Sequence, residues 1–522
     1  MSVEYIRDVL KMDQMMGANP SQALVEGDIT VPDGKPGIVR ILQIDGKITV
    51  NRLEVVQDKI MMDGMILFSI LYASEENHNV QGLDAVTNFN HSIEVLGAKP
   101  MMNGVSTQEI EHIEFTVSNS RSVKVRAIVN LDAKVTMSSD LEAIKDIQGI
   151  SDIQVLKEKV KSRTQLAKGT SQCMVKEDVE IAAELPSIER ILKNEGKAVI
   201  REVKAADNKV LVSGDVLLSI LYLSEESKES IQFINKTIPF HHAIEISGAY
   251  QGIEVETTGI VREIYLEIQE NNAGEQRILD METVVDLQAT VFEIQEKEWV
   301  TDAYSPTVQL ELDRSTVDMV QVAGENTIQQ VIKESIQLPE DLPKIQKVLV
   351  VQAKPITTDE SIENGEILVE GILELSVLYL SEDSLESMQS YPAEVPFRCE
   401  VEVAEIQPGM DLETELSIDH VSFNVTSLEE IEITVALEIT GKTFTHYTKD
   451  IVVQIKELES ISRDEPFGLK IYFAQAGDSL WNIAKQFHMT VEEILRFNAE
   501  LDREEIKPGA RILLYHKYIP VV

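Results

Sequence analysis

The strongest constraint on the fold of this 522-residue chain is an internal repeat that occurs three times. A gap-free block recurs around Tyr72, Tyr222 and Tyr379, which are spaced about 150 residues apart. The other shared columns are Gly64, Ser69, Leu71, Ser74 and Glu75; Gly214, Ser219, Leu221, Ser224 and Glu225; and Gly371, Ser376, Leu378, Ser381 and Glu382. Most of the chain is therefore one module used three times, which is inconsistent with an enzyme built on a single active-site domain.

A long strand precedes the tyrosine in each module. Apolar side chains alternate strictly over residues 60–72, 210–222 and 367–379. A period of two is typical of a strand and not of a helix. Because the shared tyrosine ends this apolar face, we interpret it as a core residue and not as a ligand. A glycine in the middle of each run, Gly64 in the first module, predicts a bulge or a bend.

Further alternating segments complete each module. Apolar alternation returns at 123–131, 284–289 and 431–439. Polar turns separate the strands at roughly ten-residue spacing, which is typical of a sandwich. The sequence therefore predicts a mainly β protein of three tandem antiparallel β-sandwich-like repeat modules. The expected module boundaries are 17–165, 166–323 and 324–458.

The pattern changes after residue 458. Residues 459–469 are polar and predict a linker, whereas residues 470–516 predict a small α+β unit of order β-α-α-β. Asp478 lies just before the first helix, where a carboxylate can cap free backbone N–H groups. Thr490 and Glu493 form the capping box of a second helix.

This C-terminal unit resembles the LysM family in its motifs. A Gly-Asp-Ser-Leu turn is followed by Ile-Ala, an asparagine closes the second helix, and Ile-x-Pro-Gly precedes the last strand. LysM domains bind N-acetylglucosamine polymers in a shallow groove, so the resemblance implies a binding groove between the two turns. The residues expected at this partner-binding groove are Gly477, Asp478, Ser479, Leu480, Trp481, Asn498 and Pro508. Trp481 is either an exposed anchor or a core side chain, and the sequence does not separate the two.

The repeats resemble the SPOCS family, also described as DUF3794. The resemblance lies in the Ser-(Ile/Val)-Leu-Tyr-x-Ser-Glu block and in the Pro-x-Ile-x-(Arg/Lys) segment before it. Three such modules and a C-terminal LysM unit are the arrangement of clostridial spore-coat morphogenetic proteins. The resemblance implies a non-enzymatic scaffold in the mother-cell cytoplasm, at the outer surface of the forespore, whose LysM unit binds the coat ATPase SpoIVA. The alternative is a protein that binds peptidoglycan or N-acetylglucosamine at the cortex or cell wall.

Composition narrows the classes of function. The chain has 47 basic and 89 acidic residues and a net charge of −42, which repels phosphate backbones, so we expect no nucleic-acid partner. The histidines are scattered and the two cysteines, Cys173 and Cys399, lie in different modules, so we expect no metal, cofactor, disulfide or catalytic residue. No uncharged apolar stretch approaches ~18 residues, and the N-terminus lacks an apolar signal segment. We therefore expect a soluble chain without a transmembrane segment.

Overall fold

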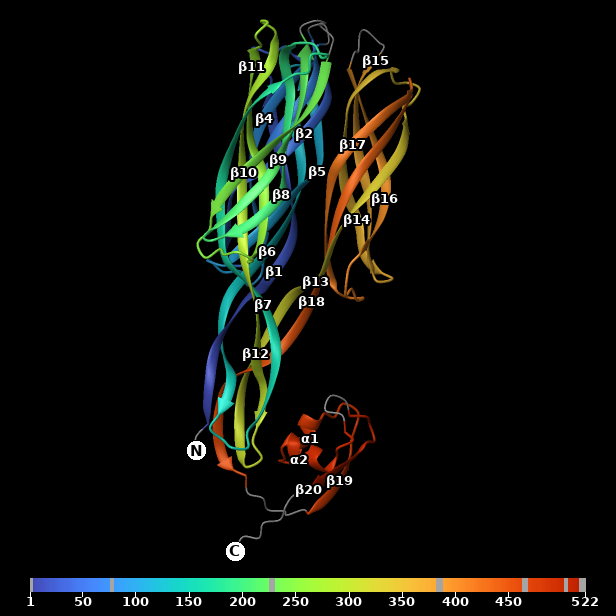
Figure 1. Ribbon diagram of the computed structural model, residues 1–522. Helices are drawn as coiled ribbons and strands as arrows, with labels where there is room; N and C mark the ends of the chain where they lie inside the picture. Colours follow the sequence, from blue (N-terminus) through green and yellow to red (C-terminus); the bar gives the residue numbers. More distant parts are fainter. Residues whose placement is uncertain are drawn as a thin grey trace.

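The computed structural model describes residues 3–75, 79–224, 231–381, 388–461, 468–501 and 506–515. Two repeat columns, Glu225 and Glu382, and most of the expected linker, residues 462–467, lie outside these residues. Long antiparallel strands dominate the described chain, and its short helices lie near the C-terminus (Figure 1). The predicted fold class is confirmed.

Each repeat contributes six strands. The first repeat has β1 (Glu4–Thr30), β2 (Ile38–Val56), β3 (Lys59–Ser74), β4 (Val80–Glu94), β5 (Asn103–Asn119) and β6 (Ser122–Gln148). The second has β7 (Gln154–Glu180), β8 (Ile188–Ala206), β9 (Lys209–Ser224), β10 (Ile231–Glu245), β11 (Glu254–Glu270) and β12 (Gln276–Tyr304). The third has β13 (Val308–Gln337), β14 (Ile345–Glu363), β15 (Glu366–Ser381), β16 (Met388–Glu402), β17 (Asp411–Ser427) and β18 (Glu430–Ser460).

The six strands of a repeat form two three-stranded sheets that face each other. In the first repeat these sheets have the orders β1-β6-β5 and β2-β3-β4, and the other two repeats copy both orders. The alternating residues predicted for the strand before the tyrosine, β3 in the first repeat, point into the space between the sheets. Each repeat therefore closes its own apolar core, as a sandwich should.

The shared tyrosines occupy equivalent positions in the three cores. Their rings are buried, and each hydroxyl donates to the carbonyl of the proline that opens the repeat block. The distances are 2.9 Å from Tyr72 to Pro36, 3.0 Å from Tyr222 to Pro186 and 3.0 Å from Tyr379 to Pro343. Burial raises the pKa of each phenol, so the three remain neutral donors. The interpretation of these tyrosines as core residues is confirmed.

The shared glycine marks a close approach between strands. In β3, Gly64 lies opposite Phe89 of β4, and a Cβ atom there would come within 2.7 Å of that phenyl ring. Gly214 and Gly371 face Phe240 and Phe397 in the same way. The predicted bulge is present, but it lies in the neighbouring strand, β2 in the first repeat, directly opposite the glycine. The position excludes a side chain because two neighbours converge on it.

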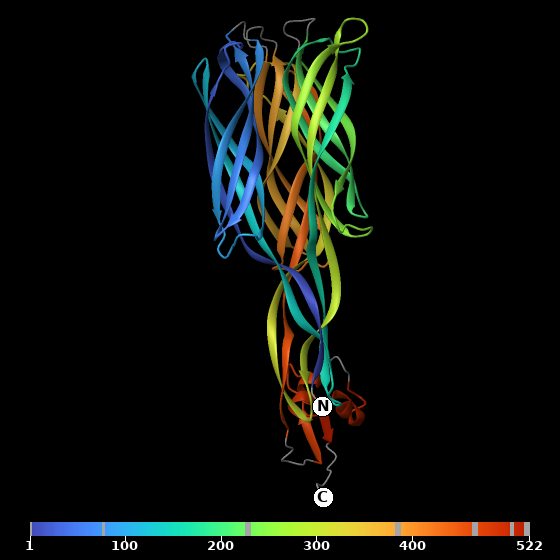
Figure 2. The same cartoon turned by 90° about the vertical axis from the view of Figure 1, so that its left-hand side faces the viewer.

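The first and last strands of each repeat pair with each other, and about half of each pair runs beyond its sandwich. Pairs β1/β6, β7/β12 and β13/β18 continue as three twisted ribbons, which pack together into a stalk below the three sandwiches (Figures 1 and 2). The expected boundaries 165/166 and 323/324 therefore fall inside the continuous strands β7 and β13. Two buried clusters fill the stalk, and each takes residues from all three repeats.

The stalk clusters show an approximate threefold relation. Ala143, Trp299 and Ile451 lie in one cluster, and the residues that follow them lie in the other. Trp299 is the bulkiest of the three and is fully buried. One chain thus builds an arrangement that in many proteins requires three separate subunits.

A second apolar cluster joins the three sandwiches, and we call it the head cluster. It contains Leu42, Leu71, Val80, Leu192, Leu221, Leu223, Ile231, Leu349, Leu378 and Met388. Around it, one cation per repeat bonds to the preceding repeat, and the first repeat bonds to the third, so that the three bonds close a cycle. Arg40 donates to Gln389 at 3.1 Å, Arg190 to the Val80 carbonyl at 3.2 Å and Lys347 to Gln232 at 2.9 Å. The repeats are therefore joined at both ends, by the stalk and by the head cluster.

The C-terminal unit has the predicted β-α-α-β order. Its elements are β19 (Leu469–Phe473), α1 (Leu480–Gln486), α2 (Val491–Phe497) and β20 (Arg511–Tyr515). Strands β19 and β20 pair antiparallel, and both helices pack on one face of this sheet. Thr490 and Glu493 form the predicted capping box. The capping role expected of Asp478 is wrong, because the hydroxyl of Ser479 accepts the α1 hydrogen bond, from Asn482 N at 3.1 Å.

Candidate functional site

Two of the residues predicted for the groove are core residues of the C-terminal unit. Leu480 is buried between the helices and the sheet. Asn498 is fully buried, and its amide donates to the carbonyls of Ile494 and Leu513 while its oxygen accepts from the Leu513 N–H, each at 2.7 Å. Asn498 therefore ties the end of α2 to β20, and its place in the motif has a structural reason.

Four more predicted residues belong to the two turns. Gly477 has φ of 89°, which favours glycine, and it is exposed together with Ser479 and Pro508. Asp478 is half-buried, and one carboxylate oxygen accepts from the Tyr472 hydroxyl and from Gln475 N, both at 2.8 Å. The exposed part of the expected groove thus consists of Gly477, Ser479 and Pro508.

Trp481, the remaining predicted residue, faces the stalk. Its indole N–H donates to Asp302 of β12 at 2.8 Å, and its ring meets Tyr304 edge-on with centroids 4.9 Å apart. Lys485, one turn further along α1, bonds to both carboxylate oxygens of Asp302 at 2.7 Å. The large aromatic of the expected groove is therefore partly covered by the chain itself.

Tyr304 belongs to the core of the C-terminal unit although it lies on β12 of the second repeat. It is 6% exposed, and its hydroxyl donates to the Met489 carbonyl at 2.9 Å. Burial, with the nearby Glu492 and Glu493 carboxylates, raises the pKa of Tyr304 far above its ordinary value. The phenol is thus a neutral donor over the whole physiological range.

The docking position is specific to the second repeat. Counted from the equivalent stalk residues Ala143, Trp299 and Ile451, Asp302 and Tyr304 correspond to Asp146 and Gln148 in the first repeat, and to Gln454 and Lys456 in the third. Only the second repeat combines the carboxylate with the tyrosine. This difference gives a physical reason why the unit docks on β12 and not on either related strand.

Asp302 carries most of the polar contact. Its side chain is 16% exposed, and it also accepts from Arg314 of β13 at 2.7 Å. Burial acts to raise the pKa of Asp302, but the hydrogen bonds from Lys485 and Trp481 outweigh it, so its pKa lies below the ordinary value. A charge-assisted pair of this kind, partly desolvated, is stronger than one on an open surface.

The lowered pKa predicts that docking is sensitive to acid. When the unit is released, Asp302 loses the hydrogen bonds from Lys485 and Trp481, so its pKa rises and docking favours the ionised form. The stabilisation is complete above the pKa of the released state and is lost as the pH falls through the lower pKa of the docked state. Fluorescence of Trp481 should report a release below about pH 4. The Asp302→Asn chain should show the released signal already at neutral pH, and an identical acid transition in both chains would contradict the assignment.

Exposed apolar side chains lie on the outer side of the two-stranded sheet and at the adjoining end of α2, and we call them the strand patch. The sheet contributes Leu469, Ile471, Phe473 and Tyr515, and α2 contributes Phe497, whose ring meets that of Tyr515. Leu469 and Phe473 are 64% and 63% exposed, and the rings of Phe497 and Tyr515 are 5.1 Å apart. The sequence analysis did not identify this patch. Its signal is the alternation of β19, in which Tyr472 points inward and the residues on either side point out.

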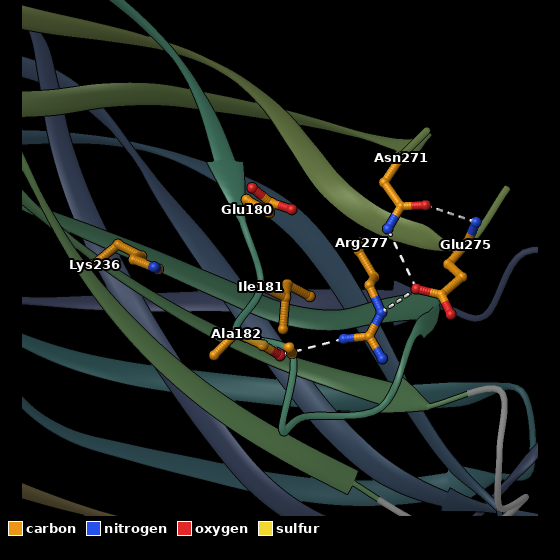
Figure 3. Close-up of a pocket in the computed structure, with 8 residues that line it drawn as sticks. Glu180, Ile181, Ala182, Lys236, Asn271, Glu275 and Arg277 are labelled. Atoms are coloured by element: carbon orange, nitrogen blue, oxygen red, sulfur yellow. Dashed lines mark hydrogen bonds and ion pairs between the residues drawn. The ribbon is translucent and has the colours of Figure 1, made fainter. Parts of the chain in front are cut away.

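A separate open pocket lies on the second repeat, lined in part by Lys236 and Arg277 (Figure 3). Arg277 does not offer its charge to a ligand. It donates to the carbonyls of Ala182 and Leu185, at 3.2 and 2.6 Å, and to Glu275 at 2.7 Å. These bonds hold the segment after β7, so the role of Arg277 is structural.

Within the described ranges, no group of three or more His, Cys, Asp or Glu side chains could hold a metal ion. Nor does any helix of that part of the chain have the length and apolar character needed to cross a membrane.

The geometry defines a tandem-repeat β protein with a small appended β-α-α-β module. Comparison with known families agrees with this description. Residues 37–118, 187–269 and 344–426 match the family described as SipL, SPOCS domain, and residues 474–514 match the LysM domain. The chain is a SPOCS-domain protein with three such domains and a C-terminal LysM domain.

One curated relative shares a short stretch with the chain. SpoIVD-associated factor A of Bacillus subtilis (strain 168) is 39% identical over 54 residues, which are 10% of this chain and 14% of that protein. The match thus spans only a small part of the relative's length. No solved structure matches the chain.

Proposed function

We propose that this protein is a non-enzymatic spore-coat adaptor that binds a SpoIVA-like coat ATPase chiefly through its LysM domain. In this proposal it acts in the mother-cell cytoplasm, at the outer surface of the forespore, and localises coat there. The three SPOCS domains, the LysM domain and the name of the Bacillus relative all support a role in the spore coat. SPOCS and LysM domains are binding modules and not catalytic ones.

The strand patch is the observation that carries the choice of a protein partner. Four exposed apolar side chains share the outer face of the β19/β20 sheet, and Phe497 of α2 adjoins them. The domain that carries them lies beside the stalk, at the end away from the three sandwiches (Figure 1). Exposed apolar patches of this kind mark protein contacts, because removing them from water is the main gain on association.

A second candidate, binding of peptidoglycan or N-acetylglucosamine, is favoured by one observation. Gly477, Ser479 and Pro508, which border the expected groove, are all exposed. Asp302 and Tyr304 cover the groove's large aromatic, Trp481, which leaves fewer surfaces for stacking a sugar ring. The protein partner is therefore the better supported proposal.

A charge placed in the strand patch tests the proposal. Ile471→Glu should weaken binding of the purified coat ATPase by about 2–4 kcal/mol, roughly 30- to 1,000-fold, because the buried contact would then hold an unpaired carboxylate. Binding is measured by titration calorimetry with the full chain. Val331→Glu is a matched control, since Val331 is an exposed apolar residue on β13 of the third repeat.

Two outcomes would count against this assignment. Equal binding by the Ile471→Glu chain, with the LysM domain shown to be folded by circular dichroism, would place the contact elsewhere. Retention of peptidoglycan by the native chain, without binding of the ATPase, would favour the glycan candidate.

A further inference from the structure

Part of α1 and of the turn after it meets the stalk, and we call this surface the docking face. It consists of Trp481, Lys485 and the carbonyl of Met489. Every polar contact that it makes with β12 goes to Asp302 or Tyr304, which lie two residues apart. Because side chains alternate along a strand, both point to the same side.

The docking face satisfies each polar group of these two residues. The indole N–H and the ammonium group hold the carboxylate at 2.7 to 2.8 Å. The ring of Tyr304 packs edge-on against Trp481, and its hydroxyl reaches the Met489 carbonyl. The docking face thus offers an indole N–H donor, a cation, an aromatic ring and a carbonyl acceptor. Together these groups match the polar groups of an aspartate and a tyrosine.

The residue between Asp302 and Tyr304 does not point toward the docking face. Ala303 is 2% exposed and points into the stalk, where it packs in the cluster that contains Ile147 and Ile455. The docking face therefore recognises one side of an extended segment at positions i and i+2. This spacing is the one that side-chain recognition of a bound strand requires.

We infer that the docking face is a receptor for an extended Asp-x-Tyr segment of a partner protein, and that Asp302-Ala303-Tyr304 of the stalk occupies it as an internal competitor. The occupied receptor is closed to such a partner until the LysM domain leaves the stalk. This inference concerns a surface other than the strand patch, and it stands whether or not that patch binds a coat ATPase.

A peptide with the sequence of residues 300–305, Val-Thr-Asp-Ala-Tyr-Ser, is the direct probe. The native chain should bind the labelled peptide weakly, because the tethered segment competes at a high effective concentration. The full chain with Asp302→Ala and Tyr304→Ala has an emptied receptor, and it should bind the peptide at least about 10-fold more tightly. Fluorescence anisotropy measures both.

Matched variants separate specific recognition of the aspartate from nonspecific binding of the peptide. A peptide with asparagine in place of the aspartate should lose most of the binding to the emptied chain, and so should adding Lys485→Met to that chain. Circular dichroism must show the LysM domain folded. If the double change unfolds it, the Asp302→Asn chain, which should already release the domain from the stalk at neutral pH, takes its place.

Three results would overturn the inference. The emptied, folded chain could bind both peptides equally, it could bind neither, or its LysM domain could remain on the stalk as judged by small-angle scattering. Each would mean that the docking face does not recognise the acid and tyrosine pair.

Discussion

Trp299→Ala is expected to lower the free energy of unfolding by about 3–5 kcal/mol, the usual cost of removing a large buried aromatic. Trp299 is fully buried in the stalk and packs with residues from all three repeats, among them Ile451 and Leu10. Its removal leaves a cavity that two ribbons from other repeats must close. The loss is measured by denaturant titration followed by circular dichroism.

Trp299→Phe is the matched control. The indole N–H of Trp299 has no hydrogen-bond partner among the described residues, so phenylalanine loses volume but no polar contact. We expect this change to cost less than half as much as alanine. A Trp299→Ala chain that unfolds within about 0.5 kcal/mol of the native one would behave like a surface variant, and it would contradict the packing of the three ribbons.

The repeat fold could be predicted from the sequence because its signals are local. Strict alternation from Ile60 to Tyr72 assigns a buried strand face, and the recurrence of these columns assigns three copies. The packing of the copies on one another could not be predicted in the same way. Leu71, Leu221 and Leu378 lie on the opposite face of their strands, and an apolar residue there looks the same whether it meets solvent or another repeat.

The stalk was missed for a related reason. Its ribbons continue the sandwich strands, and each junction is marked by a β-bulge of one residue, between Met15 and Gly17 in β1, Gln165 and Ala167 in β7, and Val322 and Gly324 in β13. A shift of one residue in a long apolar alternation does not by itself show that a strand leaves its own repeat. The sequence therefore predicted boundaries at 165/166 and 323/324, in the middle of β7 and β13. The three-dimensional contacts show that these bulges separate the sandwich half of each strand from the stalk half.

The candidate site was predicted in outline and not in detail. The LysM motif located the domain, but a motif residue can be shared because it supports the fold, as Leu480 and Asn498 do. The partners of Trp481 lie about 180 residues away on β12, and no local pattern connects them. One signal was present in the repeat alignment, where Tyr304 differs from both other copies and only the second repeat combines it with an aspartate.

Removal of the LysM domain should have the largest effect on binding. Each repeat closes its own core, and both the stalk and the head cluster are built within residues 3–461. A chain that ends at Ile461 should therefore fold, although it exposes Tyr304 where the domain was docked. The strand patch and the groove turns are absent from this chain, so it should lose more than about 100-fold in affinity for the coat ATPase.

The most direct test of the central claim is a binding measurement on two chains, the full one and the one that ends at Ile461, each titrated with the purified SpoIVA-like ATPase. Circular dichroism first establishes that the shorter chain is folded. The account predicts that the full chain binds and the shorter one does not. Equal binding by a folded shorter chain would contradict it, since the contact would then belong to the SPOCS domains.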